Sequence, residues 1–418
     1  MRAIVLLLLS LFTACEDRER LNPLDPENHL SHGAPTGLRV VSRRDTARLV
    51  WNSFEVNHLQ AYEIYRGVEP DELIIQGSIM AENTFFIDQG LTYDQPYYYA
   101  VRALTEFSQS AISDPVGFTP GPQNVWVADM YGFKLRNISY DGKTITTERE
   151  YDSPRSVEYD PGEKIIWVAD YFQKTFLGLT TKLKPKIMIP LPAEPIALTL
   201  DSLNQVLYTV LEDNTLYAFD YSGTILWQID MDRELTLATE LAYNALTENL
   251  WVSMSATNEL LMIKTRPLIK ERVVFTNLDN PGPLEADPLG SGVWVSTASG
   301  IARVDSAGNF SFYKTELFIH DLSLDPFSGD CYYTGSLERF SNWETGYLQH
   351  DHPEVSTVIL DQSVPQIYNL QVVPGTGIPG ILVQEADNHK LIRYSRAGEK
   401  LGETSGYSSH LDFALDRD

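Results

Sequence analysis

The sequence predicts an all-β protein made of two folded units. From about residue 124 to the end of the chain, one short motif recurs at intervals of about forty residues. Within each copy, apolar and polar residues alternate as they do along half-buried strands, and turn residues separate the strands. Over the same region, no stretch places apolar residues at helical spacing.

The repeated motif is a strand with a large side chain at its centre. It is clearest in the segments Asn-Val-Trp-Val-Ala-Asp at 124–129 and Ile-Ile-Trp-Val-Ala-Asp at 165–170. Seven residues occupy the equivalent central position: Trp126, Trp167, Tyr208, Trp251, Trp294, Tyr332 and Leu382. A strand repeat of this period is typical of a β-propeller with four-stranded blades. The count predicts seven blades, and six blades remain the alternative if the fifth and sixth copies are irregular.

The C-terminal end of the chain is predicted to close the ring. Each central strand after the first follows an apolar strand that ends at a turn, as in residues 156–161. The first copy has Pro-Gly-Pro at 120–122 in that place, and the missing strand is found at residues 411–416. A last strand that completes the first blade would remove the two edges that an open array exposes.

Residues 1–15 have the features of a targeting segment. Arg2 supplies a positive charge, and the apolar run that ends at Phe12 is too short for an ordinary transmembrane helix. The ending Ala14-Cys15 resembles a bacterial lipoprotein signal, and this resemblance implies lipidation of Cys15. An ordinary cleaved signal peptide is the alternative.

The resemblance also implies a place in the cell. A lipid-anchored protein would sit in the cell envelope, and Glu16 is not the Asp that retains some lipoproteins in the inner membrane, which favours the outer membrane. Residues 16–32 are polar and carry Pro23 and Pro26, so we expect a flexible tether between the anchor and the first folded unit.

Residues 33–120 are predicted to form a β-sandwich, because short alternating strands are separated there by turn residues. The pattern resembles a fibronectin type III domain. Trp51 matches the core tryptophan of that family, Tyr62 and Tyr65 match its third strand, and Tyr97 matches its tyrosine corner. The resemblance implies that these residues form a core and not a ligand site.

Residues 121–418 resemble the propellers of the NHL-repeat and YVTN-like families. The likeness lies in the Val-Ala-Asp endings at Asp129 and Asp170 and in Asp-x-x-Gly turns such as residues 220–223. It implies an architecture but no function, because propellers host binding, scaffolding and catalysis alike.

The first strand of each copy determines what faces the centre of the ring. One set of alternate positions is apolar and is expected to pack between blades: Val157, Leu198, Leu241, Leu284, Leu322, Leu370 and Phe413. Because side chains alternate along a strand, the opposite set should face a central channel. At one mouth of this channel that set places the polar residues Glu240, Asp321, Asn369 and Asp412. Two residues deeper, it places Glu158, Glu285 and Gln371.

The predicted channel is polar and acidic, and two interpretations follow. Oxygen ligands suit a hard cation such as Ca²⁺, so Glu240, Asp321 and Asp412 are weak candidates for a metal site. Lactonase-type propellers hold a divalent ion with carboxylates, and likeness to them would imply a metal-assisted hydrolase or lyase at the mouth. A water-filled channel that holds no cofactor is the simpler interpretation.

Other candidate residues carry weaker signals. His350 and His352 point the same way on a strand, but no third metal ligand is evident. Cys331 lies in a strand pattern and is expected to be a small buried hydrophobe. Trp343 and Tyr347 are expected to pack on an outer strand; the alternative, an exposed pair on a loop, would suit contact with a glycan or a protein.

The remaining signals favour a binding protein over an enzyme. The sequence contains no Gly-x-Ser-x-Gly elbow, phosphate-binding loop or Cys-x-x-Cys pair. The net charge of −25 argues against a nucleic-acid partner. We therefore expect a monomeric binding or scaffold lipoprotein that holds an envelope protein or polysaccharide at a propeller face. A small-molecule sensor is a third hypothesis that the sequence does not separate from the first.

Overall fold

The computed structural model describes residues 22–231, 239–266, 268–276, 278–338, 341–361, 366–374, 380–385, 389–408 and 411–416. The chain divides into two compact units, Met1–Thr119 and Pro120–Asp418. The described residues form antiparallel sheets and one short 3-10 helix, η1 (Ser255–Thr257). Among them no helix has the length and apolar character that a membrane crossing requires. Cys15 and the rest of the expected signal segment lie outside the described residues.

The first unit is built from two sheets that share one core. Their strand orders are β1-β2-β5 and β4-β3-β6-β7. The core buries Trp51 and Tyr62, whose rings meet edge to face with 5.3 Å between their centroids. The hydroxyl of Tyr97 accepts a hydrogen bond from the backbone N–H of Thr92 at 3.2 Å, which is the contact expected of a tyrosine corner. The strands are β1 (Arg39–Arg43), β2 (Thr46–Val50), β3 (Leu59–Gly67), β4 (Ile74–Met80), β5 (Phe85–Asp88), β6 (Tyr97–Thr105) and β7 (Val116–Phe118).

Residues 22–32, which are the described part of the expected tether, fold against the first unit. Leu24 packs on its core. Asn28 is buried, and its Oδ1 accepts the backbone N–H groups of Leu30 and Ser31 at 2.9 and 3.0 Å. The expectation of a flexible tether does not hold for this stretch, because its turns satisfy several of their own backbone groups and the core of the first unit accepts the side chain of Leu24.

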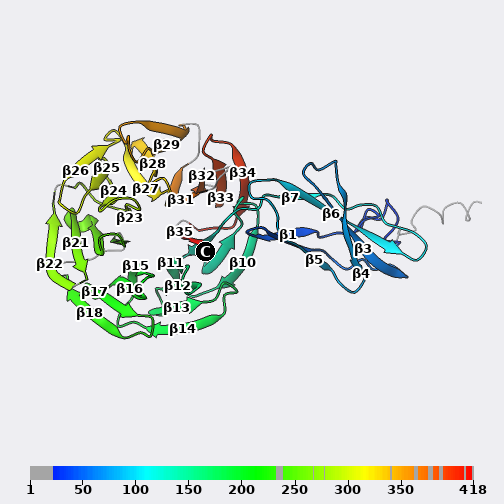
Figure 1. Ribbon diagram of the computed structural model, residues 1–418, viewed down its shortest axis with the longest axis horizontal. Coiled ribbons are helices and arrows are strands. Elements are labelled where there is room, and N and C mark those ends of the chain that lie inside the picture. The colour runs from blue at the N-terminus through cyan, green and yellow to red at the C-terminus, as the bar shows by residue number, and fades with distance from the viewer. Residues whose placement is uncertain are drawn as a thin grey trace, which may run out of the picture. The chain divides into compact units, whose positions relative to one another are not determined.

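Within the part of the second unit that the structure describes, the strands between residues 124 and 416 form seven four-stranded antiparallel sheets. Figure 1 shows them in a ring, with strands such as β11, β15 and β23 at the centre and β14, β18 and β22 at the rim. Such a ring of sheets is a β-propeller. Six sheets use consecutive strands, in the orders β11-β12-β13-β14, β15-β16-β17-β18, β19-β20-β21-β22, β23-β24-β25-β26, β27-β28-β29-β30 and β31-β32-β33-β34.

The strands of the first three of these six sheets are β11 (Pro154–Asp160), β12 (Ile165–Asp170), β13 (Thr175–Leu179), β14 (Pro185–Pro190), β15 (Pro195–Asp201), β16 (Val206–Leu211), β17 (Thr215–Asp220), β18 (Ile225–Asp230), β19 (Glu240–Asn244), β20 (Asn249–Met254), β21 (Glu259–Thr265) and β22 (Leu268–Phe275). Those of the other three are β23 (Leu284–Ala286), β24 (Val293–Thr297), β25 (Gly300–Val304), β26 (Phe310–Tyr313), β27 (Phe318–Leu324), β28 (Cys331–Glu338), β29 (Ser341–Leu348), β30 (Ser356–Leu360), β31 (Ile367–Val373), β32 (Gly380–Glu385), β33 (Lys390–Ser395) and β34 (Lys400–Ser405).

The remaining sheet joins the two ends of the propeller. It contains β8 (Asn124–Asp129), β9 (Lys134–Ile138), β10 (Ile145–Glu150) and β35 (Leu411–Asp416), in the order β10-β9-β8-β35. In β35, Leu411 lies opposite Asp129 and Asp416 lies opposite Asn124. The C-terminal strand therefore completes the first sheet, as the sequence predicted.

The repeated central residues form the cores of the sheets. All seven are at most 1% exposed. Each lies opposite a residue of the first strand that was predicted to line the channel: Glu158 pairs with Trp167, Glu285 with Trp294 and Gln371 with Leu382. The alignment of the seven copies is thus confirmed by the strand register, since one slipped residue would turn every side chain to the other face.

The residue that ends the first strand of a blade connects it to the next blade. The buried carboxylate of Asp160 accepts a hydrogen bond from the Tyr221 hydroxyl at 2.6 Å, and Asp201 accepts one from Tyr243 at 2.9 Å. At the same place in the following blade, Asn244 donates to the carbonyl of Gly292 at 3.0 Å. The corners that the sequence marks as turns therefore also hold neighbouring blades together.

Replacing Tyr221 by Phe is expected to lower the free energy of unfolding of the propeller by about 1–2 kcal/mol. The change removes one donor from a buried carboxylate and leaves the ring in place. Thermal or urea unfolding measures the loss. Tyr217→Phe is the matched control, because its hydroxyl bonds Asp213 in the turn before its own strand, at 2.9 Å. Equal losses in the two variants would contradict a role for Tyr221 between blades.

Candidate functional site

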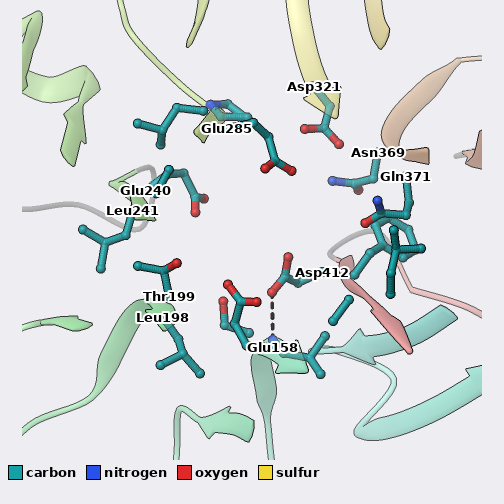
Figure 2. Close-up of a pocket in the computed structure, with 18 of the residues that line it drawn as sticks. Glu158, Leu198, Thr199, Glu240, Leu241, Glu285, Asp321, Asn369, Gln371 and Asp412 are labelled. Atoms are coloured by element: carbon teal, nitrogen blue, oxygen red, sulfur yellow. Dashed lines mark hydrogen bonds between the residues drawn. The ribbon is translucent and has the colours of Figure 1, made fainter. Parts of the chain in front are cut away.

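The central strands of the propeller enclose a cavity of about 380 Å³. Residues from the innermost strands of all seven four-stranded sheets described in the second unit line it. Figure 2 shows the polar side chains pointing toward its centre, while Leu198 and Leu241 point away from it into the blades. This division follows from the alternation of side chains along each strand.

The structure brings together every residue that the sequence placed in the channel. Glu240, Asp321, Asn369 and Asp412 line the cavity, and so do Glu158, Glu285 and Gln371. They come from six first strands around the ring, and Asn369 and Gln371 lie at two levels of the same strand, β31 (Figure 2). Thr199 adds a hydroxyl at the deeper level. The cavity therefore collects five carboxylates, two amides and at least one hydroxyl from residues that are far apart in the sequence.

Irregular pairing shapes the mouth of the cavity. The register between the first two strands of a blade shifts just before Ser156, Ala197 and Asp321, and again across Asn369. A bulge bends its strand and redirects the side chain beside it. In these four sheets, a bulge and the alternation of side chains along the strand together determine which residue of the first strand faces the mouth of the cavity.

Two of the mouth carboxylates connect neighbouring blades. Asp412 Oδ2 accepts the backbone N–H of Val157 at 2.8 Å, and Asp321 Oδ2 accepts that of Leu370 at 2.8 Å. Burial raises the pKa of both carboxyl groups, and these hydrogen bonds oppose the rise because they favour the charged form. Asp321 and Asp412 therefore have a structural task in addition to lining the cavity.

Glu240 differs from these two residues. No hydrogen bond of its carboxylate is found among the residues that the structure describes. The pKa of Glu240 is raised to about 7, mainly because the group is buried; the charge of Arg155 opposes this rise, and the charge of Asp412 adds to it. A cation that enters the cavity would therefore stabilise the charged form of Glu240 more than that of Asp321 or Asp412.

Arg155 is a functional candidate that the sequence reasoning missed. Its side chain is buried beside the cavity, with Nε donating to the Ile196 carbonyl and one terminal nitrogen 3.7 Å from the sulfur of Met130. It lies at the register shift between Pro154 and Ser156, where strict alternation does not predict direction. Its charge lowers the pKa of Glu240 and Asp412.

The metal hypothesis finds no matching geometry. Among the described residues, no three His, Cys, Asp or Glu side chains lie close enough together to hold one ion. Glu240, Asp321 and Asp412 thus share a cavity without forming a three-carboxylate centre. Ca²⁺ at this place has no support beyond the residue types.

The other candidates occupy structural positions. His350 contacts Asp287 at 3.1 Å and Arg303 at 2.8 Å, whereas His352 contacts Glu354 at 3.4 Å, so the two histidines do not share a ligand site. Cys331 is buried, and burial raises the pKa of its thiol well above the usual value.

Trp343 and Tyr347 are not on an exposed loop. They lie in β29 and are 4% and 8% exposed, which agrees with the favoured interpretation of strand packing and not with the alternative of an exposed pair. Trp343 stacks on His320 with 4.3 Å between the ring centroids.

No family model matches the chain, and no curated protein matches it. Solved structures do resemble it. A protein of Bacteroides uniformis assigned as a 6-phosphogluconolactonase has 11% identity and a TM-score of 0.53, over 70% of this chain and 99% of its own. A functionally unknown protein from Desulfotomaculum acetoxidans has 11% identity and a TM-score of 0.52, over 70% and 98%.

A third similar structure is the Cps50 (Swd1) β-propeller domain of Myceliophteria thermophila, with 11% identity and a TM-score of 0.49 over 62% of this chain and 88% of that domain. Identities this low show a shared fold and no shared activity. The chain's own ring of four-stranded sheets makes it a β-propeller protein, and its function has to be inferred from its own residues.

Proposed function

We propose that this protein is a lipid-anchored binding module of the cell envelope whose propeller receives a cationic side chain of a protein partner in its central cavity. In this proposal, Cys15 carries the lipid, a fibronectin type III domain precedes a seven-bladed propeller of the NHL or YVTN-like kind, and the propeller makes the contact. The membrane would be the outer membrane and the protein a monomer.

One observation carries the proposal: the cavity concentrates carboxylates, and Arg155 only partly offsets the charge of Glu240. A carboxyl group with a pKa near 7 has a charged form that its surroundings stabilise poorly. An ammonium or guanidinium group in the cavity would supply the missing opposite charge. The net charge of −25 would attract such a partner from a distance.

The domain assignments have separate support. The first unit has the two-sheet order β1-β2-β5 and β4-β3-β6-β7, a buried Trp51 and the Tyr97 contact described above. These features suit a fibronectin type III sandwich. Seven consecutive four-stranded sheets suit seven blades. The lipid anchor rests on residues 1–15 alone.

Calorimetric titration with a short peptide that contains one Lys tests the proposal. The peptide should bind the purified protein more tightly at pH 8 than at pH 5.5, because Glu240 is ionised only at the higher pH. Glu240→Gln should weaken binding at pH 8 about tenfold, as expected for loss of a hydrogen bond to a charged group. A counterpart with acetyl-lysine measures the contribution of the charge.

Glu399→Gln is the matched control, because Glu399 is exposed and lies away from the cavity. It removes the same charge and should leave binding unchanged. If the acetylated peptide binds as tightly as the charged one, or if the two Gln variants behave alike, the cavity is not a site for a cation. Binding of a neutral polysaccharide that depends on Glu240 would point to the other ligand class expected from the sequence.

One observation favours an enzyme as a second candidate. A carboxyl group with a pKa near 7 is suited to general acid–base catalysis, and Glu240 is such a group in a water-accessible cavity. The metal-assisted version has no three-ligand cluster among the described residues. A screen of lactone and lyase substrates in which the wild type turns over and Glu240→Gln does not would favour this candidate.

A further inference from the structure

A second hollow, of about 560 Å³, lies between the sheet of β8–β10 and the sheet of β11–β14. We call it the blade 1–2 groove, and its lining residues are Gly132, Phe133, Glu150, Tyr151, Asp152 and Phe172. Two hairpin turns, the end of β10 and the loop before β11 supply them. It therefore combines three aromatic rings with two carboxylates in a place that the cavity residues do not reach.

Two of its rings are exposed without an evident benefit to the fold. Phe172 is 62% exposed and Phe133 is 47% exposed. Phe133 also has a φ of 57°, in the left-handed region that a bulky residue rarely adopts. The residues in the same turn position of four other blades also have positive φ, and they are Lys174, Asn214, Asn258 and His389. The backbone of Phe133 is strained, and its ring is only partly buried in return. This combination is typical of a residue whose side chain contacts a ligand or a partner.

The two carboxylates of the groove lack a cationic partner. Among the described residues, no Lys, Arg or His nitrogen forms an ion pair with Glu150 or Asp152, and both side chains are exposed. The nearest basic residue in sequence, Arg149, contacts the groove residue Tyr151 but forms an ion pair with neither carboxylate. Its guanidinium lies 5.5 Å from the Tyr151 ring centroid and donates to the Leu183 carbonyl at 2.7 Å. The negative charge of Glu150 and Asp152 is therefore available to a cationic group of a binding partner.

The groove and the central cavity are neighbours. Asp152 comes just before β11, whose Arg155 and Ser156 line the cavity. Arg155 also contacts the sulfur of Met130, which belongs to the same turn as Phe133. One extended segment of a partner could therefore contact the groove and the mouth of the cavity together.

We propose that the blade 1–2 groove binds an arginine side chain of a basic protein partner, with the guanidinium between the rings of Phe133 and Phe172 and the carboxylates of Glu150 and Asp152. A guanidinium stacks on an aromatic face and bonds carboxylates with the same group, so it matches both features of the groove. A neutral sugar would match the rings but would leave the charge uncompensated. This site needs no occupant in the central cavity and stands apart from it.

Fluorescence anisotropy tests the proposal with the purified full-length protein. The probe is a labelled peptide with three Arg residues separated by Gly-Ser pairs, and its counterpart carries citrulline, which has the same shape without the charge. The Arg peptide should bind at least tenfold more tightly than the citrulline peptide. Phe172→Ala and Phe133→Asn should each weaken it about five- to tenfold, and the double variant Glu150→Gln, Asp152→Asn should do the same.

Phe327→Ala is the matched control, because Phe327 is 77% exposed on the loop between β27 and β28. It should not change binding. Phe133→Asn should unfold at the same temperature as the wild type or a higher one, because Asn tolerates positive φ better than Phe. Weaker binding by that variant therefore reports a lost contact and not a damaged fold.

Several results would overturn the proposal. Equal binding of the Arg and citrulline peptides would do so, as would unchanged binding by the groove variants or no binding at about 1 mM peptide. A neutral oligosaccharide whose binding needs Phe133 and Phe172 would assign the groove to saccharides instead. Glu240→Gln separates the two sites: the effect of Phe172→Ala should persist in that background, even if the cavity binds nothing.

Discussion

Deletion of residues 411–418 is expected to abolish the cooperative unfolding transition of the propeller. β35 supplies the innermost strand of the first sheet, and its Leu411, Ala414 and Leu415 are buried. Burial of these side chains and pairing of the β8 edge together contribute at least about 5 kcal/mol to the free energy of unfolding. This contribution is comparable to the total free energy of unfolding of many domains. Without β35, Asp412 also no longer accepts the Val157 N–H in the next blade. Calorimetry of the truncated and intact chains measures the loss.

A point variant separates this effect from the general cost of a deletion. Leu415→Asp should destabilise the propeller strongly, because it buries a charge in the closing strand. Leu226→Asp, at a site that is 48% exposed on β18, should change the unfolding temperature by only a few degrees. A truncated chain that unfolds at the same temperature as the intact one would show that the ring does not depend on this closure.

Glu240→Gln is expected to stabilise the protein at pH 8 and to leave its stability near pH 4.5 unchanged. The pKa of Glu240 is about 7 in the folded protein and near 4.5 when unfolded. Between these values the folded state binds more protons than the unfolded state, so this residue lowers stability as the pH rises through that range. The expected gain at pH 8 is about 1–3 kcal/mol, reduced by the water that reaches the cavity.

Urea unfolding at pH 4.5, 6 and 8 measures this gain. Glu399→Gln serves again as the control and should show no pH-dependent gain, since Glu399 is exposed. Asp321 and Asp412 have raised pKa values as well, but replacing them also weakens contacts between blades, so their variants report two effects at once. If Glu240→Gln gives the same gain at every pH, the charge of Glu240 is not the cause.

Much of the site was predictable because strands impose a strict geometry. Once the central residues from Trp126 to Leu382 are aligned, every first-strand position follows, since the period of a strand is two residues. The cavity lining could therefore be named residue by residue from the sequence, including Glu240 and Gln371. Arg155 was not predicted to lie beside the cavity because it is at a register shift, and the sequence carries no clear signal for a bulge there.

The sequence by itself determined the all-β class, the repeat, the closing strand and the ring of polar side chains at the centre. These features depend on local periodicity, which burial of alternate residues imposes on each strand. Only the tertiary structure decided which carboxylates are bound to a neighbouring blade and which remain uncompensated. It alone separated Glu240 from Asp321 and Asp412, buried Trp343, folded residues 22–32 onto the first unit and brought Phe133 beside Phe172. The physical reason is that hydrogen bonds, burial and charge compensation depend on neighbours that are far away in the chain, and a local pattern does not specify those neighbours.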